Sequence, residues 1–294
     1  MRALKSLISR LRKLDTLDLR CERIQEALGR IESRQLAVAS KMNLHTSEFR
    51  VFSQWGEDGI IQRLVRNISI ENPVFVEFGV QDYTESNTRF LLSNDNWSGL
   101  IIDGDQANIE AIRRSDIYWR HNLKAECRFV TRENINQLIA EAGLHGDIGL
   151  LSVDIDGNDY WVWEAITEVS PRIVVIEYNS RFGATAAVSI PYDHAFSRAR
   201  AHHSMIYYGA SLRALTLLGI RKGYSLVGCN TAGNNAFFVR NDCLPADLSV
   251  LTVEQAFVAG KFRESRNADG ELQFLSPDEE RRLLASLPLT DVST

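Results

Sequence analysis

The stretch "VFVEFGVQDYTESNT", residues 74–88, determines how the rest of the chain is interpreted. A short apolar run, interrupted only by Glu77, leads into Gly79 and then into a series of polar residues. This pattern predicts a buried strand that ends in a tight turn. An acidic residue inside such a strand indicates a functional edge, because burial of an unpartnered carboxylate costs free energy.

Strand-like and helix-like segments alternate on both sides of this stretch. We expect strands at Val74–Phe78, Leu100–Ile102, Cys127–Val130, Gly149–Val153, Ile173–Ile176 and Ala236–Val239. We expect helices at Glu57–Asn67, Ser86–Asn94, Gln106–Arg114, Glu133–Ala142, Asp159–Glu168 and Ala210–Lys222. The alternation predicts an α/β fold, a parallel sheet with helices on both faces. Ligands of such sheets bind beyond the carboxyl ends of the strands.

Composition narrows the class of protein. A chain of 294 residues with 45% hydrophobic residues can bury a full core, and its net charge of -5 argues against nucleic-acid binding. The four cysteines lack the spacing of a zinc site and are typical of a reducing compartment. The sequence has neither an apolar run long enough to cross a membrane nor a signal peptide, so we expect a cytoplasmic protein.

The chain divides into three predicted parts: an N-terminal amphipathic or coiled-coil helix (1–40), a main domain (48–245) and a C-terminal helical extension (246–294). Apolar residues recur along the first helix in steps of three and four, with one additional step of three between Leu14 and Leu17. This pattern fits a short coiled coil with a stammer or a docking helix. The basic residues of its first turns would also suit an anionic membrane surface. We favour a homo-oligomer or a protein partner, and contact with the inner face of the membrane is the alternative.

Residues that follow the first two strands suggest an adenosine-type ligand. Gly79 permits a close backbone approach, and Asp103, at the end of the second strand, can hold the two hydroxyls of a ribose. A dinucleotide is not indicated, because the full glycine pattern is absent. The candidate cofactor-binding residues are Gln54, Glu77, Gly79, Gln81, Asn87, Asp103, Gly104 and Asp154. Gln54 belongs to "SQWGED" (53–58), which either contacts the ligand or caps the following helix.

Acidic residues follow the next two strands. Asp154 and Glu177 would meet at one rim of the sheet, where carboxylates suit a hard divalent cation such as magnesium. Asp156 could then act as general base, so Asp154 and Asp156 are the candidate catalytic residues. In the alternative, Asp156 belongs to a simple turn; we assign Asp159 to a helix cap. A histidine, His202 or His203, is a second candidate base.

Together these segments resemble the FkbM-like family and related metal-dependent sugar O-methyltransferases, which are S-adenosylmethionine-dependent enzymes of the Rossmann-like class. The resemblance covers roughly residues 53–242 and rests on "FSQWGEDGIIQRL", "VFVEFGVQDYTESNTRFLL", "GLIIDGD", "LLSVDIDGNDYWVWEAI", "PRIVVIEYNS" and "NNAFFVRND". It implies a seven-stranded sheet whose last strand is antiparallel, with the methionine part of the cofactor near Glu77 and Gly79 and the ribose on Asp103.

The resemblance also implies a magnesium site. In that site Asp154, Glu177 and Asn179 would bind the ion, and Asp156 would be the general base. This chain departs from the family pattern after the fifth strand, where it has Glu177-Tyr178-Asn179 in place of adjacent acids.

We therefore expect an O-methyltransferase that uses S-adenosylmethionine, with Mg2+ as the candidate second cofactor. Its acceptor would be a sugar hydroxyl, in bacterial surface polysaccharide or glycan biosynthesis. The alternative is a noncatalytic scaffold subunit that docks glycan-assembly enzymes through its N-terminal helix. A nucleotide-sugar dehydrogenase or epimerase is disfavoured by the missing dinucleotide glycines and by the lack of a YxxxK pair.

Overall fold

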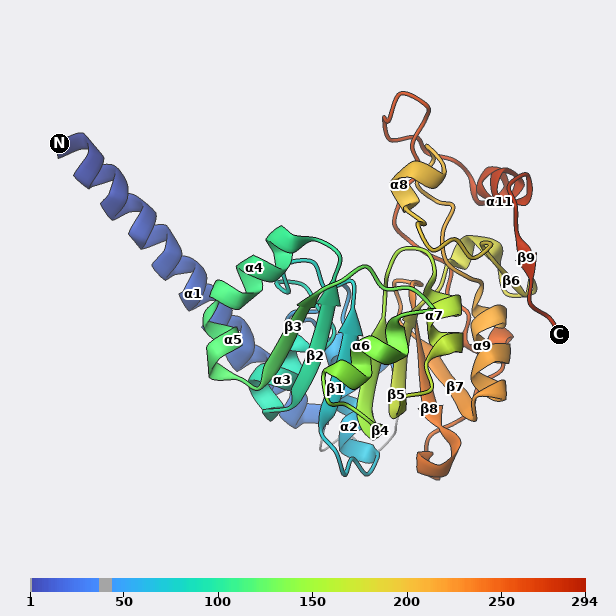
Figure 1. Ribbon diagram of the computed structural model, residues 1–294, viewed down its shortest axis with the longest axis horizontal. Helices are drawn as coiled ribbons and strands as arrows, with labels where there is room; N and C mark the ends of the chain where they lie inside the picture. Colours follow the sequence, from blue (N-terminus) through green and yellow to red (C-terminus); the bar gives the residue numbers. More distant parts are fainter. Residues whose placement is uncertain (1, 37–43) are drawn as a thin grey trace.

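The computed structural model describes residues 2–36 and 44–294; within the first helix it describes the side chains of residues 17 and 19–36. In the described part, seven strands form one sheet in the order β3-β2-β1-β4-β5-β8-β7 (Figure 1). Their bounds are β1 (Val74–Phe78), β2 (Ser98–Asp103), β3 (Leu123–Cys127), β4 (Gly146–Val153), β5 (Val169–Glu177), β7 (Tyr224–Cys229) and β8 (Asn235–Arg240). Strand β8 pairs antiparallel with both β5 and β7, and the other pairs are parallel. The predicted seven-stranded α/β sheet is confirmed.

Helices cover both faces of the sheet. Helices α2 (Glu57–Asn67), α3 (Arg89–Asp95) and α4 (Gln106–Arg114) pack on one face. Helices α6 (Ile135–Glu141), α7 (Asp159–Ala165) and α9 (Leu212–Arg221) pack on the other. The remaining helices are α1 (Arg2–Leu36), α5 (Asp116–Arg120), α8 (Arg198–Ala201), α10 (Val253–Ala256) and α11 (Pro277–Ala285). Single 3-10 turns occur at His45–Ser47, Ser180–Phe182 and Asn241–Cys243.

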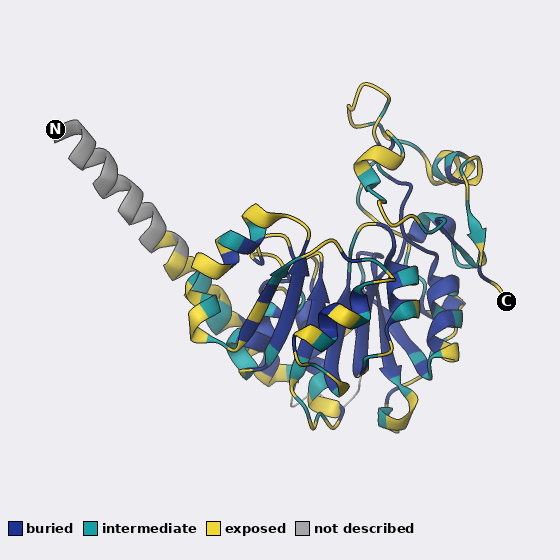
Figure 2. Ribbon diagram, viewed as in Figure 1, coloured by how far each residue is buried: buried dark blue, intermediate teal, exposed yellow. Residues whose placement is uncertain are grey.

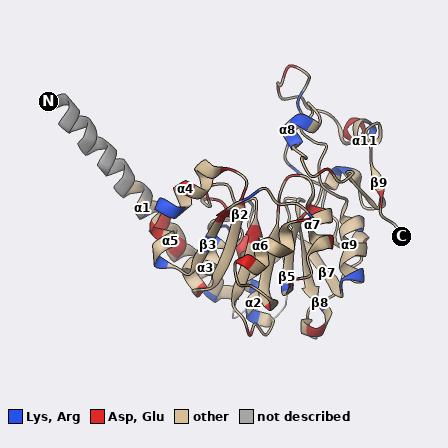
Figure 3. Ribbon diagram, viewed as in Figure 1, with Lys and Arg blue, Asp and Glu red and all other residues tan. Residues whose placement is uncertain are grey.

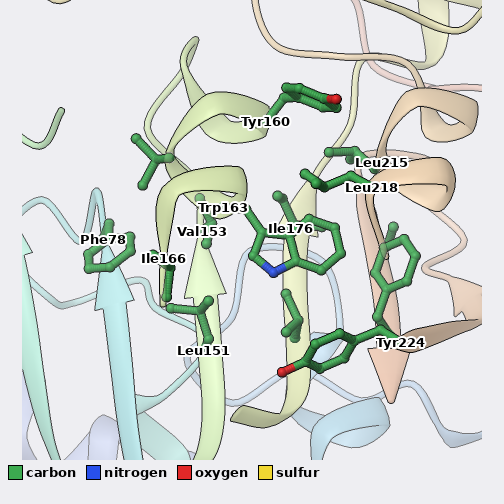
Figure 4. Packing of buried hydrophobic residues seen from close by; sticks show 14 of the residues in the cluster. Phe78, Leu151, Val153, Tyr160, Trp163, Ile166, Ile176, Leu215, Leu218 and Tyr224 are labelled. Atoms are coloured by element: carbon green, nitrogen blue, oxygen red, sulfur yellow. The ribbon is translucent and has the colours of Figure 1, made fainter. Parts of the chain in front are cut away.

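The strands are buried nearly throughout, as Figure 2 shows. Their side chains alternate between the two faces, so every strand of the sheet except the edge strand β3 contributes to both hydrophobic clusters. Between α7, α9 and the sheet, the ring of Trp163 lies 5.1 Å from Phe238 and 6.0 Å from Tyr224, measured between centroids (Figure 4). This packing fixes α7, and α7 begins at one of the predicted site residues.

Two strands of the structure differ from the strands expected from the sequence. Strand β3 runs over Leu123–Cys127 rather than over Cys127–Val130, because the alternation of buried Leu123, exposed Lys124 and buried Ala125 is the pattern of a strand near the sheet's edge. Strand β7 was absent from the segments read directly from the sequence; its pairing with β8 shifts register between Leu226 and Gly228.

The ends of the chain lie outside the sheet. Residues 37–43 and the basic side chains of the first helical turns fall outside the described residues. After β8, residues 246–294 contain α10, α11 and β9 (Thr290–Asp291), which pairs with β6 (Val188–Ser189). Among the helices that the structure describes, none has both the length and the hydropathy needed to cross a membrane.

Candidate functional site

A cavity of about 430 Å3 lies at the carboxyl ends of β1, β2, β4 and β5. Of the eleven residues that the sequence singled out, ten line it: Gln54, Glu77, Gly79, Gln81, Asn87, Asp103, Gly104, Asp154, Asp156 and Glu177. They come together because parallel strands all end at the same edge of the sheet. The eleventh, Asn179, does not line the cavity. Its amide donates to the carbonyl oxygens of Ile206 and Tyr208 and accepts from the backbone of Arg181.

Glu77, the acid inside β1, holds the loop that follows its own strand. One carboxylate oxygen accepts from the Asn87 backbone at 2.9 Å, and the other accepts from the Ser86 hydroxyl at 2.6 Å and from Thr88. Ser86 therefore does not cap α3, which begins at Arg89 with Thr88 as its N-cap. Burial raises the pKa of Glu77, and these hydrogen bonds oppose the rise. Glu77 thus sets the shape of the cavity wall.

Residue 79 must be a glycine because the backbone that follows β4 lies directly against it. Its φ is +74°, and a Cβ atom built on it would lie 1.7 Å from the carbonyl oxygen of Asp154. A side chain here would therefore push β1 and β4 apart at the cavity. The close approach in this structure is to the chain itself, and the predicted approach to a ligand stays a prediction.

Asp103 ends β2 in a fixed orientation. Its Oδ2 accepts from the Gln81 backbone at 2.8 Å, and its Oδ1 accepts from the Asp105 backbone at 2.8 Å. Oδ1 also accepts from the Asn108 side chain at 3.2 Å, so it is Oδ2 that retains a lone pair and can still accept from a hydroxyl. Nearby, Phe129 lines the cavity with 55% of its surface exposed. Sequence reasoning missed Phe129 because it assigned this residue to the interior of a strand.

Three carboxylates converge where β4 and β5 end. Oxygen atoms of Asp154, Asp159 and Glu177 all lie within 4.8 Å of one another. Oε2 of Glu177 is buried and has no hydrogen-bond partner in the described chain. Burial, reinforced by the neighbouring acids, raises the pKa of Asp154 and of Glu177 well above the usual range. Such a cluster has the donor set that a hard divalent cation prefers.

Asp159 belongs to this cluster, although the sequence assigned it to a cap. It is the first residue of α7, and its two oxygens accept from the backbone of Ile155 at 2.8 Å and of Gly157 at 2.9 Å. The loop 154–158 is thereby folded back toward the helix, and the Asp159 carboxylate lies beside Asp154 and Glu177 without lining the cavity. Burial raises its pKa to about 6.

Asp156 is held at the cavity by a residue from a distant segment. Its φ is +55°, in the left-handed region that few side chains adopt. Its carboxylate accepts from Nη1 of Arg198 at 2.6 Å. Arg198, on α8 (blue in Figure 3), also pairs with Glu264 and lies over the ring of Tyr208 at 3.9 Å. Arg198 and Glu264 were missed because no local motif marks them.

The residues of the segment "SQWGED" divide between the loop before α2 and the cavity. Asp58 accepts from the backbones of Val51, Phe52 and Ser53, and Glu57 accepts from Trp55 and Gly56, so both acids order the loop before α2. Gln54 and Trp55 instead line the cavity.

The cavity has an aromatic edge. The ring of Trp55 stacks on Phe262 with 5.5 Å between centroids and 17° between planes, and Phe196 lines the same cavity. The candidate bases His202 and His203 do not line it, and their rings stack on each other at 4.2 Å.

Comparison with known proteins finds no matching family model and no matching curated protein. Solved structures do match. They include an S-adenosylmethionine-dependent methyltransferase from Clostridium acetobutylicum (10% identity, TM-score 0.40, 63% of this chain and 90% of that chain). The N-terminal domain of EvdMO1 with SAH bound matches with 10% identity and TM-score 0.42 over 72% of this chain and 94% of that chain. An O-methyltransferase from Bacillus cereus in complex with SAH matches with 12% identity and TM-score 0.36 over 73% of this chain and 88% of that chain. At such identities the likeness concerns the fold alone. The seven-stranded sheet with the antiparallel strand β8 is the sheet that the resemblance in the sequence implied.

Proposed function

We propose that this protein is an S-adenosylmethionine-dependent O-methyltransferase whose acceptor is a sugar hydroxyl. The observation that carries the proposal is that one cavity is lined both by Asp103, which ends β2, and by Asp154 and Glu177, two of the three convergent carboxylates near the ends of β4 and β5. The first suits a ribose and the second suits the activation of a hydroxyl.

The cofactor would bind along β1 and β2. Asp103 lines the cavity and is oriented by the backbones of Gln81 and Asp105, and its Oδ2 retains a lone pair to which a ribose hydroxyl can donate. Phe129 offers an exposed ring for an adenine base. S-adenosylmethionine would supply the methyl group.

The chemistry would occur beside Asp154, Asp159 and Glu177. The unpartnered Oε2 of Glu177 and the close spacing of the three acids fit a divalent cation. Such an ion would lower the pKa of an acceptor hydroxyl. Asp156 would accept the hydroxyl's proton, and Arg198 would keep its carboxylate facing the cavity. Holding the acceptor in line with the methyl group would supply much of the remaining rate enhancement.

A hydroxyl-rich acceptor suits the rest of the lining. Two buried amide oxygens, Oδ1 of Asn158 and Oδ1 of Asn235, have no hydrogen-bond partner among the described residues, and both residues line the cavity. Hydroxyl groups of an acceptor could satisfy them. The stacked rings of Trp55 and Phe262 provide a flat apolar surface for the face of a sugar ring.

Methyl transfer to a panel of glycans, with the product detected by mass, tests the proposal. We expect activity with S-adenosylmethionine that is lost in excess chelator and restored by Mg2+. Asp156→Asn should bind the cofactor as wild type does and lose at least about 100-fold in turnover, whereas Asp278→Asn, an exposed acid on α11, should leave both unchanged.

The outcomes distinguish the proposed function and mechanism from their alternatives. Cofactor binding without transfer to any acceptor would favour the noncatalytic scaffold. Full turnover in chelator would remove the metal from the mechanism. Equal turnover of Asp156→Asn and wild type would remove Asp156 as base.

A further inference from the structure

One face of α1 exposes a regular apolar stripe to solvent. Leu17, Cys21, Ile24, Leu28 and Ile31 follow one another in steps of four, three, four and three, and all five are exposed. The exposed fractions of the four aliphatic side chains lie between 49% and 60%. This is the alternating spacing of a heptad repeat, with Cys21 and Leu28 at position a and the other three at position d.

The domain contacts a different face of the helix, one made of small and polar residues. A Cβ atom on Gly29 would lie 2.3 Å from Val51, so the helix approaches the domain closely there. Ser33 is buried and donates to Gln62 at 2.6 Å, and Gln25 donates to the backbone of Val51. Glu22 pairs with Arg89 on α3. The helix is thus held by its polar face while its apolar face is exposed. In a monomeric domain the apolar face of a helix normally packs on the core and the polar face is exposed.

We propose that this stripe binds the same stripe of a second copy of the chain, forming a parallel two-stranded coiled coil. The stripe from Leu17 to Ile31 is about 21 Å long at 1.5 Å per residue. An isolated pair of helices this short would be marginal. Here the domain already holds α1 as a helix, so much of the ordering entropy is not lost on pairing.

The charges beside the stripe set the orientation. Arg20 and Arg34 lie on one flank, at position g, and Glu32 lies on the other, at position e. An antiparallel pair would bring Arg20 of one helix beside Arg34 of the second copy. A parallel pair in register places Arg20 beside Gln25, and Glu32 beside Ala27, of the second copy, so it brings no like charges together.

The domain also limits the number of strands. Leucine at a with isoleucine at d favours more than two strands in free coiled coils. In this chain Gln25, at position e, is bound to the backbone of Val51, so one flank is occupied by the chain's own domain. A two-stranded coiled coil covers less of that flank than a coiled coil of three or four strands does.

Sedimentation of the full chain tests the pairing. We expect twice the chain mass of 33.2 kDa for wild type. Ile24→Asp combined with Leu28→Asp should raise the dimer dissociation constant at least about 100-fold, because two carboxylates would then be buried in the seam. Ile220→Asp on α9 is the matched control, since Ile220 is 63% exposed and lies outside the stripe; this variant should remain dimeric. Circular dichroism of each variant verifies that the chain is folded.

Oxidation of Cys21 tests whether the two helices are parallel. A parallel pair in register places the two Cys21 thiols in one layer, so diamide, by removing the two thiol hydrogens, should join them by a disulfide. Cys21→Ser should abolish the covalent dimer. A dimer that diamide cannot link would overturn the parallel orientation, and a fourfold mass would overturn the two-stranded geometry. A monomer at micromolar concentration, or a dimer that survives the double substitution, would overturn the pairing. A monomer that binds anionic vesicles would identify lipid as the occupant instead.

Discussion

At the scale of single residues, the acids of this chain divide into those that build the cavity and those that remain available to a ligand. Glu77 and Glu57 have both oxygens occupied by backbone and side-chain donors of neighbouring loops. Glu177 has an oxygen with no partner in the described chain. Residue type alone cannot make this distinction, because both groups are buried carboxylates near strand or helix ends.

Asp58 should make stability depend on pH. Burial raises its pKa from 3.8 to about 6, against the opposing hydrogen bonds from Ser53 and Val51. The folded state therefore holds this proton more tightly than the unfolded state, so the contribution of Asp58 to stability is present below pH 4 and is lost as the pH rises toward 6. Asp58→Asn, which does not titrate, should gain about 1 kcal/mol relative to wild type between pH 5 and pH 7.

Urea unfolding of both proteins at the two pH values measures this difference. A relative stability that does not change with pH, or that changes in the opposite sense, would show that the hydrogen bonds outweigh burial at Asp58.

Gly79→Ala should destabilise the fold more than an alanine at an equivalent glycine. Gly183 has the same φ of +74° and would have no atom within 4 Å of its Cβ, whereas the Cβ at Gly79 would meet the Asp154 carbonyl oxygen. We expect a loss of about 1 kcal/mol for Gly183→Ala and about 3 kcal/mol for Gly79→Ala in urea unfolding. Equal losses would mean that β1 and β4 separate without cost.

At the scale of elements, the carboxyl edge of the sheet is joined to its surroundings by a few buried polar contacts. Glu57, at the start of α2, accepts from the side chains of Asn230 and Asn235 at the turn into β8. Arg198 similarly connects α8 with the loop after β4 and with Glu264. The cavity therefore depends on elements that are far apart in the sequence.

Glu57→Gln should weaken this connection. An amide cannot accept at both ends, so donors of Asn230 and Asn235 or of the Trp55 and Gly56 backbones would lose their partner in a fully buried position. We expect thermal or urea unfolding to show a loss of at least roughly 2 kcal/mol. Glu110→Gln, which removes an exposed ion pair with Arg114 on α4, should cost less than about 0.5 kcal/mol. Similar losses in both variants would contradict a structural role for Glu57.

At the scale of the whole molecule, three acids held together are destabilising unless a ligand compensates them. If a divalent cation binds the cluster, it should raise the melting temperature of wild type by about 5 °C or more at saturating concentration. Glu177→Gln should melt higher than wild type in chelator, because a buried charge is removed, and should gain nothing from the cation. Asp278→Asn should keep the wild-type gain. An unchanged melting temperature in wild type would contradict the metal site.

The sequence by itself determined the α/β class, most strands and the edge at which the candidate residues gather. It could do so because strand burial and turn chemistry are local, and because all parallel strands end on one side. The tertiary structure alone decided that Asp159 lies beside Asp154 and Glu177 while Asn179 is held by the backbone of residues 206 and 208, that Arg198 reaches Asp156, and that α1 faces outward with its apolar stripe. These relations depend on how loops fold back and on contacts between distant segments. No local pattern of residues encodes them.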